Sequence, residues 1–155
     1  MPRWCCPDSG RVSAVADPGA IGAVFAALFA AHHIGDHIFQ TDHQAQHKAG
    51  TGWLAVRAMA GHLASYHACM IVALAGLAAA GVPLTVAGCA AGLLFSAVTH
   101  GFLDRRWPVR WLLEHTGSRA FAASQTPLHG MYLGDQSLHV GCLFVASLLV
   151  VIVGG

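Results

Sequence analysis

Four long apolar stretches alternate with polar connections along the chain, and they predict four helices. The stretches lie at about residues 20–48, 53–80, 83–104 and 132–153. The last three each have the ~20 residues that cross a hydrocarbon core of ~30 Å. The continuously apolar part of the first, residues 20–31, is shorter, so the polar residues after it must share the span. We therefore predict an all-α fold, a four-helix transmembrane bundle in one domain over residues 19–155.

The segments outside the four stretches differ in character. Residues 1–18 form a tail with Pro, Asp and Ser, which we expect to be disordered. The third loop, from residue 105 to residue 130, is long and polar. Within it, Trp107 and Trp111 alternate with arginines, a pattern that predicts a short interfacial helix; a plain amphipathic loop is the alternative.

The distribution of Lys and Arg predicts an orientation. With four spans, the first and third loops lie on one side, and they carry Lys48, Arg57, Arg105, Arg106, Arg110 and Arg119. The opposite side has only Arg3 and Arg11. By the positive-inside rule, both termini should lie outside and the two basic loops should face the cytoplasm.

Composition supports the membrane prediction and adds one unusual feature. Of the 155 residues, 55% are hydrophobic and 10% are charged, whereas soluble domains average about 25% charged residues. The net charge of +1 is too small for a nucleic-acid-binding surface, so the expected partner is the lipid bilayer. The cysteines form no C-x-x-C pair, which argues against a structural zinc knuckle, and adjacent Cys5 and Cys6 have no assigned role. The unusual feature is the eleven histidines, which outnumber the Lys and Arg residues together.

Several histidines pair with acidic residues inside the predicted spans, where ionisable groups are costly and usually functional. At helical spacing of four residues, each pair shares one helix face. The aligned residues are His32, Asp36 and Gln40 in the first span, His62 in the second, His100 and Asp104 in the third, and Asp135 and His139 in the fourth. All four sets fall at the predicted cytoplasmic end of the bundle, so their side chains should meet at one site.

Carboxylates and imidazoles converging in a bundle core suit one or two divalent ions such as Zn²⁺, Mn²⁺ or Fe²⁺. The predicted metal ligands are His32, Asp36, His62, His100, Asp104, Asp135 and His139. Among them Asp36, Asp104 and Asp135 are the candidate catalytic bases or nucleophiles. Gln40, Gln136, His33 and His67 are predicted to orient ligands or to add further ones. Buried hydrogen-bonded pairs without metal, and proton or ion conduction, are the alternatives.

The other polar residues around these helices are expected to lie in water. This group follows the predicted membrane exit of the first helix or lies in the third loop, and consists of His37, Asp42, His43, His47, Lys48, His115 and His129.

At the same motifs the sequence resembles a bacterial family of predicted integral membrane proteins, domain-of-unknown-function family 3307. The pattern is His-x-x-x-Asp-x-x-x-Gln from His32, His62 in the second helix, His-x-x-x-Asp from His100, and Asp-Gln-x-x-His from Asp135. The likeness covers about residues 20–153 and is greatest to actinobacterial-type members, which share the Arg105-Arg106-Trp107 loop. It implies a multi-pass protein of the bacterial inner membrane, and it supplies no reaction.

Three functions follow from these features. The first is a membrane-embedded metal-dependent hydrolase acting on a lipid-like molecule or a lipid-linked phosphate, with Arg105, Arg106 and Arg110 contacting anionic head groups. The second is a small metal-ion or proton transporter, or a subunit of one, in which a homo-oligomer would complete the path. The third is a non-catalytic structural protein that docks a cytoplasmic partner on its basic loops.

Overall fold

The computed structural model describes residues 17–153, and the regular structure in that range is entirely helical. The elements are α1 (Pro18–His33), η1 (Ile34–Ile38), α2 (Asp42–His47), α3 (Gly52–Ala79), α4 (Val86–Leu103), α5 (Trp107–His115), α6 (Arg119–Ala123) and α7 (Gly130–Ile152). Within the described range, four helical segments are long and apolar enough to cross a membrane: α1 with η1, α3, α4 and α7. The predicted all-α four-helix bundle is confirmed. Most of the predicted tail, with Cys5 and Cys6, lies outside the described residues.

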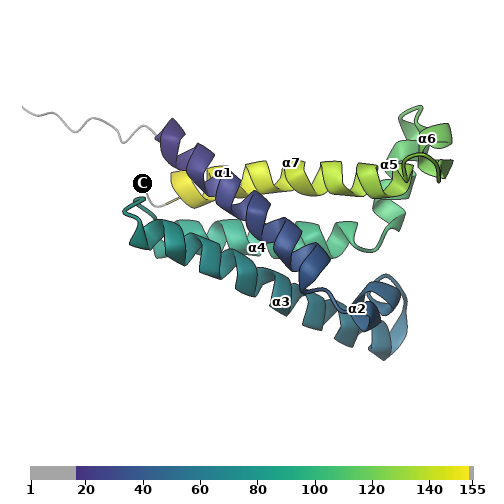
Figure 1. Cartoon of the computed structure of the whole chain (residues 1–155), viewed down its shortest axis with the longest axis horizontal. Helices are drawn as coiled ribbons and strands as arrows, with labels where there is room; N and C mark the ends of the chain where they lie inside the picture. Colours follow the sequence, from purple (N-terminus) through teal and green to yellow (C-terminus); the bar gives the residue numbers. More distant parts are fainter. Residues whose placement is uncertain (1–16, 154–155) are drawn as a thin grey trace, which may run out of the picture.

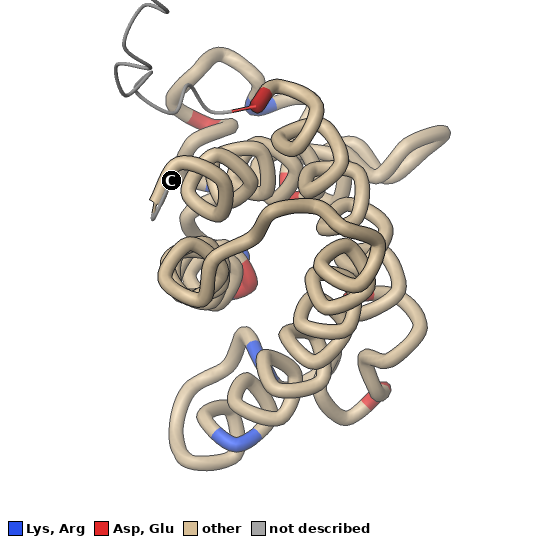
Figure 2. The backbone as a smooth tube through the Cα atoms, turned by 90° about the vertical axis from the view of Figure 1, so that its left-hand side faces the viewer, with Lys and Arg blue, Asp and Glu red and all other residues tan. Residues whose placement is uncertain are grey.

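The four long helices run alternately up and down (Figure 1). α1 packs against α3 and α7, and α4 packs against the same two helices, so the chain closes into a ring of neighbours. The start of α1 and the end of α7 lie at one end of the bundle, and α2, α5 and α6 lie at the other. A view along the bundle shows that few positions of the long helices are Lys, Arg, Asp or Glu (Figure 2).

The first predicted helix is divided into three pieces. α1 continues into the π-helical turn η1, closed by the hydrogen bond from Phe39 N to Ile34 O (3.0 Å). The helix then stops, and Thr41 starts α2 with a capping box in which its hydroxyl accepts from Gln44 N (3.3 Å) and Gln44 Oε1 accepts from Thr41 N (2.9 Å). The hydrophobic pattern across residues 20–48 showed no sign of this break.

Two glycines bring α4 against α7. A Cβ on Gly88 would overlap the carbonyl oxygen of Val150. A Cβ on Gly92 would meet the side chain of Val150 and lie 2.9 Å from the carbonyl oxygen of Ala146. The G-x-x-x-G spacing therefore permits backbone contact between these helices, as it does in membrane helix pairs.

The inside of the bundle has an apolar half and a polar half. Near the termini the core consists of apolar side chains from α1, α3 and α7, among them Val24, Leu28, Met70, Leu143 and Val150. Toward the opposite end the buried residues become histidines and acids. The end with α2, α5 and α6 therefore holds the chemically reactive groups.

The third loop contains the predicted short helix. α5 begins at Trp107 and buries Val109 completely, while Trp107 and Trp111 are 60% and 56% exposed. Two exposed indoles on one short helix are typical of a membrane interface, where an apolar ring meets water. The interfacial position of α5 remains a prediction.

Candidate metal centre

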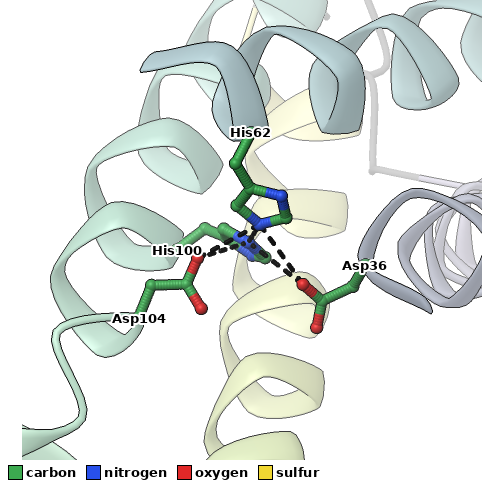
Figure 3. A group of neighbouring side chains, drawn as sticks. All are labelled: Asp36, His62, His100 and Asp104. Carbon is green, nitrogen blue, oxygen red and sulfur yellow. Dashed lines mark hydrogen bonds and ion pairs between the residues drawn. The ribbon is translucent and has the colours of Figure 1, made fainter. Parts of the chain in front are cut away.

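Four buried side chains from three parts of the bundle converge on one point (Figure 3). Asp36 comes from the π-helical turn η1, His62 from α3, and His100 from α4. Asp104 follows the last residue of α4 and caps that helix. One ligand atom from each lies within 4.8 Å of all the others.

The spacing of these four atoms fits a tetrahedral ion. His62 Nε2 lies 3.3 Å from Asp36 Oδ1 and 3.1 Å from Asp104 Oδ2. His100 Nε2 lies 3.8 Å and 3.2 Å from the same two oxygens, and the two Nε2 atoms are 2.9 Å apart. An ion with ligand bonds of 2.0–2.1 Å in a tetrahedron places its ligands about 3.3–3.4 Å from one another. The five measured edges are distributed around that value, so the four atoms could accept such an ion with small adjustments.

A second group shares Asp104 with the first. Asp104, Asp135 and His139 also bring one ligand atom each within 4.8 Å of the others. Asp135 Oδ1 and His139 Nε2 are buried and have no hydrogen-bond partner in the described structure, whereas His139 Nδ1 lies 2.9 Å from the Asp135 carbonyl oxygen. Unpaired buried polar atoms are costly, and a cation held by this group is one way to compensate for them. Three protein ligands leave a coordination position open.

Lys48 is the one residue of this centre that we expected in water, and that expectation is wrong. Its side chain is 7% exposed, and Nζ lies 2.8 Å from Asp104 Oδ2, 3.5 Å from Asp36 Oδ1 and 3.1 Å from His62 Nε2. Because the helix breaks after η1, α2 packs against α3, and Lys48, which follows α2, lies beside the ligand side chains. The capping box that begins at Thr41 was the sequence signal that would have revealed this turn.

Asp104 is the acidic group with the shortest of these contacts, 2.8 Å to Lys48 Nζ, 3.1 Å to His62 Nε2 and 3.2 Å to His100 Nε2. Three nitrogens around one carboxylate oxygen stabilise its negative charge and compensate for burial. The ionised carboxylate is the form that binds a cation.

His32, a predicted ligand, lies beside the four-ligand group and is already fully hydrogen-bonded. Gln136 Nε2 donates to Asp36 Oδ2 (3.2 Å), so Gln136 Oε1 points at His32 and accepts from its Nε2 (2.9 Å). With the ring proton on Nε2, His32 Nδ1 accepts from Tyr66 Oη (3.1 Å). His32 and Gln136 thus orient Asp36 from behind rather than presenting a free ligand atom. Tyr66 was not among the predicted site residues, and its place on an apolar helix face gave no signal.

The remaining predicted site residues lie near the centre without joining it. Gln40 lines the cavity described below, and its Oε1 has no hydrogen-bond partner in the described structure. His33 packs its ring against Phe29, and His67 Nδ1 lies 2.8 Å from the Leu63 carbonyl oxygen. Most of the histidines expected in water are exposed, namely His37, His43, His115 and His129; His47 is half-buried.

A polar cavity of about 470 Å³ opens beside the ligands. Asp36, Asp104 and Asp135 lie on its wall together with Lys48, and Arg106 and Arg110 contribute positive charge from the third loop. Arg105, predicted as a third head-group contact, does not line the cavity. Its Nη1 instead donates to the carbonyl oxygens of Gly50 (2.9 Å) and Lys48 (3.5 Å) and so fixes the loop before α3.

A family model with the description "Protein of unknown function (DUF3307)" matches residues 24–154 of the chain. The matched range contains every residue of the two ligand groups. No curated protein and no solved structure matches the chain.

Proposed function

The chain belongs to the family of unknown function DUF3307, and because that description names no reaction, we propose from the site that it is a membrane-embedded, metal-dependent hydrolase. Its substrate is a lipid-like molecule or a lipid-linked phosphate. Divalent Zn, Mn or Fe ions, one or two per chain, are the proposed cofactors.

The observation that carries the proposal is the double use of Asp104. It belongs to a four-ligand group with tetrahedral spacing and to a three-ligand group with an open position. Zinc sites with four protein ligands are usually structural, whereas catalytic sites keep a position free for water or substrate. A carboxylate shared by the two groups would bridge two ions, which is the arrangement of many two-metal hydrolytic centres.

Charge balance favours at least one divalent ion. The two ligand groups contain three carboxylates, Asp36, Asp104 and Asp135, and Lys48 contributes one positive charge. With neutral histidines this leaves two negative charges in a largely buried site, and one divalent ion offsets them. A second ion would need further negative charge, which water-derived hydroxide and an anionic substrate would supply.

Each residue then has a defined task. Ions held by these residues would lower the pKa of a bound water and so supply an activated nucleophile for hydrolysis. Asp135, whose side chain is 22% exposed on the cavity wall, is the proposed acceptor of the water proton. Arg106 and Arg110 hold the anionic oxygens of the substrate. The water oxygen joins the terminal phosphorus, the bond from that phosphorus to the oxygen on the lipid side breaks, and this oxygen takes up the proton that Asp135 accepted from the water.

The surroundings support a substrate that reaches the site from a membrane. The cavity lies at the end of the bundle where α5 exposes Trp107 and Trp111. This end also carries the two basic loops, so the positive-inside rule would place it in the cytoplasm and the substrate in the inner leaflet. We propose the inner membrane of a bacterium as the location.

Transport is less well supported because the ionisable residues do not continue through the bundle. The core near the termini is formed by Val24, Leu28, Met70, Leu143 and Val150, all almost completely buried. A transported ion would need polar groups or water along this half of the path. Within the described residues, the chemistry is gathered at one end.

Metal stoichiometry tests the proposal directly. Purified full-length protein in detergent, loaded with Zn²⁺ or Mn²⁺ and freed of excess ion, should retain at least about one ion per chain by elemental analysis, and about two when both ligand groups are filled. His139→Gln should lose the ion of the open site and keep the other, whereas Asp104→Asn should weaken both. His115→Gln, a histidine exposed outside the centre, is the matched control.

Activity is measured with the same preparations. Phosphatidic acid and a polyprenyl diphosphate in mixed micelles are the probes, and released phosphate is the readout. We expect metal-dependent release that stops with chelator and in His139→Gln. Wild-type protein that retains less than about 0.1 ion per chain after loading would refute the proposal.

A further inference from the structure

Lys48 occupies an unusual place for a lysine beside metal ligands. Its ammonium nitrogen lies 2.8 Å from Asp104 Oδ2, 3.1 Å from His62 Nε2 and 3.5 Å from Asp36 Oδ1. These are three of the four atoms of the tetrahedral group, so the ammonium caps one face of the tetrahedron. It interacts with the same atoms that would bind an ion.

The ammonium and an ion cannot both hold these positions. An ion at the centre of the tetrahedron, with ligand bonds of 2.0–2.1 Å, would lie only about 3 Å from Lys48 Nζ. Two cations at that distance in a buried site repel each other strongly, because little water screens them. Metal binding therefore requires that the side chain of Lys48 moves.

The backbone of Lys48 is fixed by hydrogen bonds, whereas its side chain borders a cavity into which it can move. Lys48 N donates to the Gln44 carbonyl oxygen (2.9 Å), and its own carbonyl oxygen accepts from Arg105 Nη1 (3.5 Å). The side chain is a flexible four-carbon stem that already lines the polar cavity. A change of rotamer would move the ammonium from the ligands toward Arg106 and Arg110, without any movement of a helix.

We propose that Lys48 is a displaceable cation that stabilises the metal-free centre. When a metal ion binds, the Lys48 ammonium moves into the cavity, where it joins Arg106 and Arg110 in binding an anionic substrate. The proposal rests on the metal centre proposed above and adds a residue that couples metal occupancy to substrate binding. The empty and loaded centres then differ in which cation the carboxylates hold.

Metal affinity measures the competition. The full-length protein in detergent is titrated with Zn²⁺ against a chromophoric chelator at fixed pH, as wild type, Lys48→Met and Arg57→Met. Arg57 is an exposed residue of α3, so its substitution removes the same charge away from the centre. If the ammonium occupies the ligands nine-tenths of the time, its removal should tighten zinc binding about tenfold, and Arg57→Met should bind as wild type does. Equal or weaker binding by Lys48→Met would overturn the proposal while leaving the metal centre intact.

Wild-type protein supplies a second measurement that does not depend on how the variant folds. Lys48 is the single lysine of the sequence, so modification by a small amine reagent can be followed at one peptide by mass spectrometry. Zn²⁺ should speed acetylation of Lys48 several-fold, because the ammonium leaves its carboxylate partners for the open cavity. A rate that is unchanged or slowed by Zn²⁺ in protein that binds the ion would refute the displacement. Protein that binds no ion would refute both this proposal and the metal centre.

Discussion

Gln136 offers a direct test of whether the hydrogen bonds behind Asp36 prepare the metal centre. Gln136→Leu keeps the approximate size of the side chain and removes two bonds, one from His32 Nε2 (2.9 Å) and one to Asp36 Oδ2 (3.2 Å). The bond to the carboxylate is worth about 1.5–3 kcal/mol and the neutral bond about 0.5–1.5 kcal/mol. Without them Asp36 loses the contact that orients its second oxygen.

The expected effect on metal binding follows from these values. Residues that orient metal ligands typically contribute 10–100-fold to affinity, or about 1.4–2.7 kcal/mol, which is close to the strength of the carboxylate bond alone. We therefore expect Gln136→Leu to weaken zinc binding by about 10–100-fold in the chelator competition assay. Gln125→Leu is the control, because Gln125 lines the same cavity but is exposed and forms no hydrogen bond to a ligand in the described structure. Zinc binding by Gln136→Leu as tight as that of wild type would refute the role of this hydrogen-bond chain.

Two further predictions concern the framework that holds the site. Gly88→Ala places a methyl group against the Val150 carbonyl oxygen and should destabilise the bundle by about 1–3 kcal/mol. Gly141→Ala, where an added Cβ meets open space, should be neutral or slightly stabilising. Thermal unfolding in detergent measures both variants, and equal melting temperatures would contradict the close α4–α7 contact. Arg105→Ala removes the hydrogen bonds to the Gly50 and Lys48 carbonyl oxygens and should increase hydrogen exchange of the backbone amides in residues 47–52. Arg119→Ala, at an exposed position, is the control. Unchanged exchange in Arg105→Ala would show that Arg105 does not fix this loop.

The hydrophobic pattern was sufficient to predict the bundle and the end at which its polar residues gather. Helical spacing put His100 with Asp104 and Asp135 with His139, and the four-span topology brought both pairs near Asp36 and His62. The pattern could not separate ligands from the residues that support them. His32 looked equivalent to His100 in sequence, and only the contacts with Tyr66 and Gln136 show that both of its nitrogens are already used. Such pairings depend on side-chain direction across helices, which one-dimensional spacing does not contain.

The break in the first helix decides what kind of centre this can be. An uninterrupted α-helix rises 1.5 Å per residue, so twelve residues would carry Lys48 about 18 Å beyond Asp36, into water. The π-helical turn and the capped start of α2 reverse the chain instead, and Lys48 Nζ lies 3.5 Å from Asp36 Oδ1. The segment that supplies the ligand Asp36 thereby also places the positive charge of Lys48 in the acidic centre. π-helical turns frequently mark functional sites. Here the turn at Ile34–Ile38 has a specific consequence: it aims Asp36 at His62, and the reversal after it adds the cation that any bound metal would have to displace.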